Sequence, residues 1–503
     1  MSALVTRFQQ HRLNTALLLL LITTAAFVGA VAGYRSSFTL QALFRLLVLT
    51  NIVLVAYLVL LRNIVAGLLV YLYSLVFLNY YWRIVIPGIW PDLDIPRIMF
   101  SFVWLIFLLE ILLGQKRMLP NTSIGTMMML VLGAITLSMF TNGTPAIRQF
   151  LNGYVIPYAM FVICKNIFTE RRDVEKFVFW LAIPLALYFP ATAILEHYRV
   201  TSLLFPRYIG KALIGEVEVN WGGRAMGAFI QPVATGFAMI GVYVLAMYSL
   251  SRVRRTAARL YAVLISIITP IGVFFTYTRS VYMGFAAALL ILMAFSRRLR
   301  LTALLLLVLM ALGVIGNWAN ITTAERTSGG LGDVDTAQAR VVIAFVSVNM
   351  FMDHPFFGIG FTRFIEKAKP YIGQVRTTFL GYREAWIGEY TNQHNQFLSV
   401  LTEIGLVGFA PFLLLYVLML RTLWKARGTV TNLYDSEFVV AVWAVMVAYL
   451  SQLLFIEPRF FEFMNCFPFM MAGIVAGGYQ RAAMERAAGG NRCQALQRKE
   501  YAT

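Results

Sequence analysis

Apolar stretches of roughly 17–25 residues recur along the chain, each long enough to cross about 30 Å of membrane hydrocarbon as a helix. Of the 503 residues, 60% are hydrophobic and only 13% are charged, whereas a soluble domain is about half apolar and a quarter charged. The sequence therefore predicts an all-α polytopic membrane protein without a sizeable soluble domain. We expect about fourteen transmembrane helices, in the range 12–14, near residues 13–33, 39–61, 64–82, 98–114, 124–141, 151–168, 177–195, 225–250, 260–278, 281–295, 301–318, 397–420, 438–456 and 463–480.

Basic residues gather in alternate connections between these stretches. Counted from an N-terminus inside the cell, the inner connections and both chain ends hold 24 Lys or Arg against seven Asp or Glu. This positive-inside pattern places both termini in the cytoplasm, and it accounts for nearly all of the formal charge of +19. The charge therefore gives no reason to expect a nucleic-acid partner. We expect a multi-pass protein of the bacterial inner membrane.

Two connections on the opposite, outer side are long, and they divide the chain. One covers residues 196–224, and the other, residues 319–395, holds seven basic and seven acidic residues. A long, charge-balanced loop is usually functional rather than a simple connector. We expect N-terminal helices over residues 1–140, a membrane domain over 141–480 that includes the periplasmic loop 319–395, and a cytoplasmic tail over 481–503.

The first half of the long loop predicts an amphipathic helix. Asp335 and Gln338 have the spacing of a capping box, and the chain then continues to Met352 without Gly or Pro. The helix should end at His354-Pro355, because the residue before a proline is disfavoured in helical geometry. An apolar stripe at helical spacing suggests that the helix lies on the membrane–water boundary; it consists of Val341, Phe345, Val348 and Met352.

His394 ends the long loop and lies at the outward start of the next transmembrane helix. The helix dipole there favours a neutral imidazole, which can accept a proton. Glu403 follows nine residues later, roughly 13 Å deeper. A carboxylate at that depth is costly unless it faces a cavity or a cation. The sequence leaves both explanations open for Glu403.

Four segments, taken in order, resemble the O-antigen ligase family, which also contains polysaccharide polymerases. The clearest is His394-Asn395 leading into Phe397-Leu398 and then Glu403, Gly405 and Gly408, similar to the family pattern HN-x-x-L … E-x-G-x-x-G. In the second, Arg340 opens a helix that ends in His354-Pro355 and is followed by Gly358-Ile359-Gly360. The third is Thr278-Arg279-Ser280, where the family has Ser before Arg. The fourth, from Arg224 to Pro232, resembles the pattern R-x-x-G-x-F-x-x-P. The resemblance covers roughly residues 140–480.

This resemblance implies a metal-independent, inverting glycosyltransferase of the GT-C type that needs no cofactor. Such an enzyme moves a glycan from a polyprenyl (undecaprenyl) diphosphate carrier to an acceptor hydroxyl, either another glycan or a lipid-A core, outside the inner membrane. Arginine forks bind phosphate oxygens, and a hydroxyl acceptor benefits from a positioned base. The resemblance assigns diphosphate binding to Arg340, Arg279 and Arg224, the catalytic base to His394, and supporting roles to Glu403 and Asn395.

Other interpretations stay open. Arginines at a membrane edge often extend toward lipid phosphates, and Glu216 and Glu218 offer Arg224 simple ion pairs. His354 is better explained as a residue that ends a helix, and Asp353-His354 lacks a third metal ligand.

An O-antigen or exopolysaccharide polymerase and a ligase share the donor chemistry, although the chain length favours a polymerase. A flippase or transporter is the alternative from another class, and other polysaccharide-assembly proteins are possible partners.

Overall fold

The computed structural model describes residues 64–78, 83–84, 93–114, 116–142, 146–214, 223–316, 334–376 and 393–500. The first two expected spans, residues 13–33 and 39–61, lie outside these ranges. Within the described residues the chain is almost entirely helical; the exception is one antiparallel pair of two-residue strands, β1 (Arg83–Ile84) and β2 (Leu93–Asp94). The all-α prediction is therefore confirmed for this part of the chain.

Eight helical segments among the described residues are long and apolar enough to cross a membrane. They are α4 (Ile95–Leu112), α5 (Ser123–Asn142), the continuous run of α6 (Ile147–Phe150), η1 (Leu151–Val155) and α7 (Ile156–Ile167), α8 (Arg171–His197), α10 (Pro232–Leu250), α11 (Thr256–Phe275), α18 (Gln396–Arg427) and α19 (Ser436–Leu453). Shorter apolar helices are α3 (Ile64–Phe77), α12 (Arg279–Phe295) and α13 (Arg300–Gly316). The last expected span corresponds to α20 (Glu462–Glu500). The chain is a multi-pass membrane protein.

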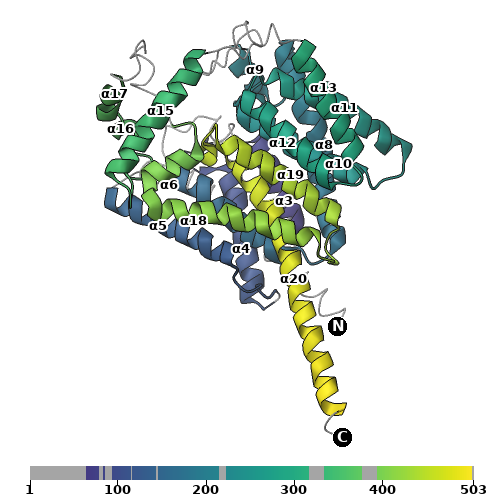
Figure 1. Ribbon diagram of the computed structural model, residues 1–503. Coiled ribbons are helices and arrows are strands. Elements are labelled where there is room, and N and C mark those ends of the chain that lie inside the picture. The colour runs from purple at the N-terminus through teal and green to yellow at the C-terminus, as the bar shows by residue number, and fades with distance from the viewer. Residues whose placement is uncertain are drawn as a thin grey trace, which may run out of the picture.

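The helix ends gather on two opposite faces of the bundle. We call one the site face; it contains the starts of α4, α10, α12 and α18 and the ends of α5, α8 and α11. Hydrogen bonds between distant segments hold this face together: Gln396 Nε2 donates to Tyr154 Oη at 2.7 Å, and Ala225 N donates to Phe275 O at 2.9 Å. In Figure 1 the far end of α20 extends away from the bundle, on the side opposite α9 (Arg207–Leu213) and α15 (Val334–Asp353).

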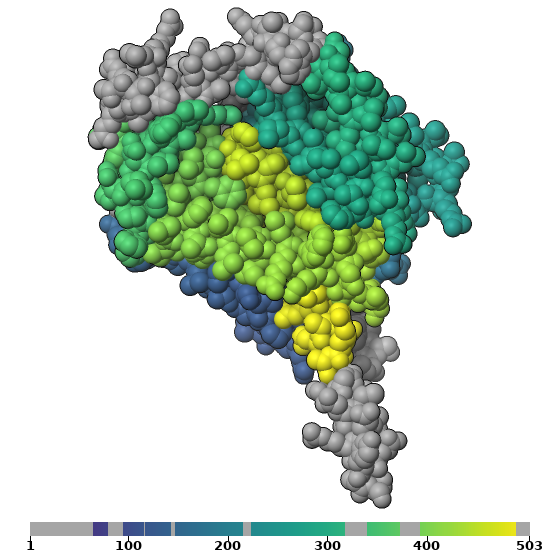
Figure 2. Space-filling model, viewed as in Figure 1, coloured from purple at the N-terminus to yellow at the C-terminus, as the bar shows by residue number. Residues whose placement is uncertain are grey.

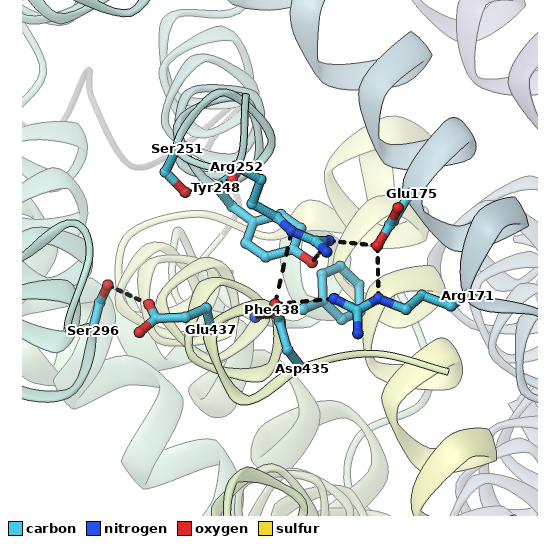
Figure 3. Close-up of polar contacts among 9 residues, drawn as sticks. All are labelled: Arg171, Glu175, Tyr248, Ser251, Arg252, Ser296, Asp435, Glu437 and Phe438. Atoms are coloured by element: carbon cyan, nitrogen blue, oxygen red, sulfur yellow. Dashed lines mark hydrogen bonds and ion pairs between the residues drawn. The ribbon is translucent and has the colours of Figure 1, made fainter. Parts of the chain in front are cut away.

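Ion pairs connect the helix ends on the opposite face (Figure 3). Arg171, at the start of α8, contacts Glu175 at 2.7 Å and Asp435 at 3.4 Å. Arg252, just after α10, contacts the same Glu175 at 2.6 Å. All of these side chains are partly exposed, so each pair contributes about 1 kcal/mol or less to stability. Basic residues of this face therefore join three helices, beyond any part they play in membrane topology.

The long loop has a small hydrophobic core of its own, and its helices lie beside α18 and α5 in Figure 1. This core joins α15 to α16 (Phe364–Lys367) and α17 (Lys369–Arg376). Its buried residues are Val342, Ile343, Val346, Met350, Ile359, Phe364 and Ala368, and Tyr371 and Ile372 of α17 pack against them. The predicted helix is confirmed, but it begins at Val334, so Asp335 lies inside the helix and is not its N-cap. The predicted apolar stripe lies on the exposed face of α15. The rest of the loop, residues 319–333 and 377–392, lies outside the described residues.

The remaining short helical turns connect the longer helices at the site face. The span expected over residues 225–250 begins only at Pro232, because residues 223–231 form a loop in which Gly227 has a φ of 57°. The short turns are η2 (Thr201–Leu203), η3 (Gly227–Phe229) and η6 (Pro458–Phe460).

Candidate functional site

His394 immediately precedes the cap of α18, as the sequence predicts. Its side chain is exposed, and its backbone is left-handed, with a φ of 51°. That conformation is uncommon for a residue other than glycine, and the His394 N–H donates to Glu457 Oε1 at 3.2 Å. Asn395 is the N-cap: its side-chain oxygen accepts from Leu398 N at 3.0 Å. His394 thus ends the long loop, and Asn395 caps the start of α18. The imidazole of His394 lies at the surface.

Glu403 is fully buried and pairs with a cation that the sequence analysis did not single out. Its two carboxylate oxygens accept from Arg459 Nη1 at 2.5 Å and Nη2 at 3.0 Å. The backbone N–H of Thr362 donates to the same carboxylate at 3.0 Å. Of the two explanations left open, the cationic partner is therefore the one observed. Glu403 connects to His394 through Arg459 and Glu457, rather than by direct contact.

Arg459 lies between two buried glutamates. Besides Glu403 it contacts Glu457, and its guanidinium lies 5.5 Å from the centre of the Phe361 ring. Burial alone would lower the pKa of Arg459, but the charges of Glu403 and Glu457 raise it, so the guanidinium stays protonated. Glu457 also accepts from Ser399 Oγ at 3.2 Å. One signal in the sequence was available: Glu457-Pro458-Arg459 places opposite charges beside a proline between two apolar stretches.

Two of the predicted motifs form a single backbone interlock. Gly405 interrupts α18 with φ 66° and ψ −167°, and residues 355–360 occupy the gap. Ile359 N donates to Thr402 O and Gly360 N to Glu403 O, both at 2.9 Å. A Cβ on Gly405 would lie 2.4 Å from Phe356 O, and one on Gly358 would lie 2.4 Å from Glu403 C. Glycine is required at both positions, because backbone lies where a side chain would begin.

Arg340 lies in the first half of α15, and this helix packs on α18. Its guanidinium is 5.8 Å from the centre of the Phe455 ring. Ser347, seven residues further along α15, is buried, and it accepts from Gln393 Nε2 at 3.3 Å through its hydroxyl and from Thr402 Oγ1 at 3.2 Å through its carbonyl. These contacts hold α15 beside the start of α18. They also place Arg340 over the segment that holds His394.

Arg279 is the first residue of α12. Its Nε is buried and has no hydrogen-bond partner among the described residues. The carbonyl of the next residue, Ser280, accepts from Gln452 Nε2 near the end of α19 at 2.7 Å. Thr278, where the family pattern has serine, donates its hydroxyl to Thr276 O at 2.7 Å. Threonine therefore supports the turn before α12 in this chain.

Arg224 lies in the loop before α10, which a buried carboxylate fixes. Glu196, near the end of α8, accepts from Met226 N at 2.6 Å and from Gly227 N at 2.7 Å. The hydrogen bond from Ala225 N to Phe275 O attaches the loop to the end of α11. The ion pairs expected with Glu216 and Glu218 lie outside the described residues. Sequence reasoning missed Glu196, since only the folded loop shows what this carboxylate binds.

Residues 452–459, from the last turn of α19 to the short turn before α20, connect most of these groups. Gln452 contacts the residue after Arg279, Phe455 lies beneath Arg340, Glu457 binds the backbone of His394, and Arg459 binds Glu403. In Figure 2 this yellow part of the chain lies between the green of α15 and α18 and the teal of the middle helices. This segment thus contacts the side chain of Arg340, the backbone of His394 and the carbonyl of Ser280 beside Arg279. The loop that holds Arg224 is bonded through Ala225 to the end of α11.

Residues 260–413 match the family model described as O-Antigen ligase. The matched region runs from α11 into α18 and includes Arg279, Arg340, His394 and Glu403, but not Arg224 or Arg459. No curated protein matches the chain. The predicted family resemblance is confirmed over this region, which is shorter than the 140–480 that the motifs suggested.

Proposed function

We propose, from the O-antigen ligase region at residues 260–413, that this chain is a membrane glycosyltransferase. It moves a glycan from a polyprenyl (undecaprenyl) diphosphate carrier to an acceptor hydroxyl at the outer face of the bacterial inner membrane. The observation that carries the proposal is that residues 452–459 contact the Arg340 side chain, the His394 backbone and the backbone carbonyl of Ser280 next to Arg279. One region of the site face then offers two cations and one base.

The chemistry follows from these side chains. The acceptor oxygen attacks the anomeric carbon, the bond from that carbon to the diphosphate oxygen breaks, and His394 takes the hydroxyl proton. Polyprenyl diphosphate leaves with the bonding electron pair. Arg279 and Arg340, with Arg224 at the side, stabilise its negative charge through charge-assisted hydrogen bonds. A single displacement of this kind inverts the anomeric centre, and the arginines provide the positive charge that a metal ion provides in other transferases.

The same proposal fixes the orientation in the membrane. The site face is periplasmic, and the opposite face, with Arg171 and Arg252, is cytoplasmic, in line with the positive-inside pattern. With the two expected helices before residue 64, the chain has about fourteen spans in a GT-C-like arrangement. Its length leads us to favour a polymerase, which joins carrier-linked repeats, over a ligase that uses a lipid-A core.

Turnover by purified protein tests the proposal. We expect the wild type to elongate or transfer an oligosaccharide supplied on polyprenyl diphosphate. His394→Ala should lower kcat by about 10²–10⁴-fold, the range for a lost general base. Arg340→Ala should lower it by about 10²–10³-fold, the range for a lost donor to a developing negative charge.

Two matched variants in the same loop control for nonspecific damage. His354 is an exposed histidine, and Arg363 pairs with Glu366 at the surface. His354→Ala and Arg363→Ala should retain wild-type kcat. Equal losses in all four variants, or full activity in folded His394→Ala, would remove His394 from the mechanism.

A further inference from the structure

A small polar cavity lies inside the bundle, beside Arg459. Its walls come from the run of α6, η1 and α7, from α18 and α19, and from η6 and α20. All of its lining residues except Gly153 are buried, so bulk solvent does not reach it. Its volume is about 10 Å³, which is about the space that one water molecule needs.

Three side chains that line this cavity have a buried polar atom without a hydrogen-bond partner among the described residues. These atoms are Arg459 Nε, Tyr158 Oη and Gln396 Oε1, and none of the three residues is more than 4% exposed. Arg459 Nε is a donor, Gln396 Oε1 is an acceptor, and the hydroxyl of Tyr158 can be either. A water molecule offers two donors and two acceptors, so a single molecule matches this set.

We infer that the cavity is a buried hydration site, where one water molecule accepts from Arg459 Nε, donates to Gln396 Oε1 and bonds to Tyr158 Oη. Empty cavities in proteins are apolar, whereas buried water pairs polar groups that would otherwise stay unpaired. Ordering one water costs less free energy than leaving three buried groups unpaired. A cation is disfavoured by the guanidinium of Arg459, and an anion by Glu403 and Glu457, which already neutralise it.

The hydration site joins two contacts that hold His394 in place. On one side Arg459 binds Glu457, which accepts from the His394 N–H. On the other side Gln396, two residues after His394, donates from Nε2 to Tyr154 Oη at 2.7 Å. The water molecule therefore links the Arg459 network to the first residue of α18. We assign it, and Tyr158 with it, a positioning role for His394, and this role rests on the proposed function.

The backbone next to the cavity is also unusual. η1 is a π-helical segment, and such wide turns inside helices are frequent at functional sites. Gly153 of this segment lies against η6, since a Cβ on Gly153 would be 2.7 Å from Arg459 Cβ. Residues 147–167 lie outside the region 260–413 that matches the family model. The hydration site thus extends the candidate site into a part of the chain that the family model does not cover.

Hydroxyl radicals generated by X-rays test for the water, because they form from water itself and oxidise the side chains that it touches. Full-length protein in nanodiscs is irradiated, and the oxidation of single tyrosines is measured by mass spectrometry. We expect Tyr158 to be oxidised although it is buried. Tyr71, which is also buried but bonds to Glu462 and Cys466, should stay unmodified. An unmodified Tyr158, or equal oxidation of the two tyrosines, would overturn the hydration site.

Tyr158→Phe keeps the shape of the cavity and removes one partner of the water. Oxidation of Tyr416, which lines the same cavity, should then fall. We expect kcat to fall by about 2–10-fold, the equivalent of one net hydrogen bond, with donor KM unchanged. Tyr243→Phe is the matched control, since Tyr243 is a buried tyrosine outside this cavity, with its hydroxyl 3.2 Å from Ser266 Oγ. It should keep both the oxidation of Tyr416 and kcat.

The outcomes separate the site from its role. Unchanged oxidation of Tyr416 in Tyr158→Phe would overturn the hydration site. Reduced oxidation with wild-type kcat, or a raised donor KM, would overturn the positioning role. If the wild type transfers no glycan, the proposed function fails, and the oxidation of Tyr158 still decides whether the cavity holds water.

Discussion

Arg459 and its two glutamates are the residues on which the geometry of the site most depends. Removing one member of a buried, hydrogen-bonded ion network typically costs about 3–5 kcal/mol, because the remaining charge is left uncompensated. Here the network also fixes backbone: Glu403 holds Thr362, and Glu457 holds His394. Glu403 could be found from the sequence as a carboxylate inside an apolar stretch. Its partner could not, because Arg459 is 56 residues away and only the folded chain pairs them.

Glu457 should affect catalysis through His394 rather than through the substrate. Glu457→Ala removes the acceptor of the His394 N–H, and we expect kcat to fall by about 10–100-fold, as for a displaced catalytic group, with little change in donor KM. Glu457→Gln keeps an acceptor oxygen and should retain more of kcat. Steady-state kinetics with each folded variant measures both constants.

A carboxylate on the opposite face provides the control for Glu457. Glu437 accepts from Ser296 Oγ at 2.5 Å (Figure 3) and from Arg297 N at 2.9 Å. Glu437→Ala should change stability only. Were Glu457→Ala to raise KM with kcat unchanged, Glu457 would belong to substrate binding and not to the positioning of His394.

The interlock between α18 and residues 355–360 explains, at the scale of elements, why the two motifs occur in one chain. Sequence reasoning identified Gly358-Ile359-Gly360 as a turn and Gly405 as part of a transmembrane helix, and both lie where predicted. It treated them as separate because a break inside a helix leaves no mark on an apolar stretch. Their hydrogen bonds and the close approach of their backbones make them one structure.

Alanine substitutions at these glycines should disrupt the interlock. In Gly405→Ala and Gly358→Ala the new Cβ would meet backbone atoms, and φ is positive at both positions. We expect a loss of about 2 kcal/mol or more in stability, as for overpacking with strain, and a matching loss of activity. Thermal unfolding of protein in nanodiscs measures the first, and turnover measures the second.

Gly133 provides the comparison. A Cβ there would have no heavy atom within 4 Å, and the residue is exposed in α5. Gly133→Ala should therefore be neutral, or stabilising by up to about 1 kcal/mol through helix propensity. Similar melting temperatures for Gly405→Ala and Gly133→Ala would show that the interlock is not rigid.

At the scale of the whole molecule, the sequence predicts the parts better than their assembly. Apolar length was enough to locate the apolar helices that the structure describes from residue 64 onward, since each must span the same hydrocarbon thickness. Arg340 and His394 were recognised from local motifs, and both contact the segment 452–459 at the site face. Of the segment 452–459, residues 452–456 were predicted as the end of a transmembrane helix and residues 457–459 only as part of a short connection. Its importance comes from contacts with residues 56–172 positions earlier in the chain, and no local pattern encodes these.

The two faces of the molecule contain different kinds of polar groups. The site face contains the buried network and the predicted catalytic and phosphate-binding groups, and the opposite face is joined by partly exposed ion pairs. A transporter would be expected to carry its unusual charges near the membrane midplane, between repeated halves. In this chain the charge network reaches the backbone of His394 at a helix start. An enzyme that works at one membrane surface fits this arrangement better.

Stoichiometry in proteoliposomes tests this account most directly. Wild-type protein is given a donor that carries the cell's own oligosaccharide on polyprenyl diphosphate, and both the released carrier and the extended glycan are quantified. We expect one polyprenyl diphosphate to be released for each glycan transferred, and neither product to be formed by His394→Ala. Movement of intact donor between leaflets, without release of carrier, would contradict it and favour a transporter.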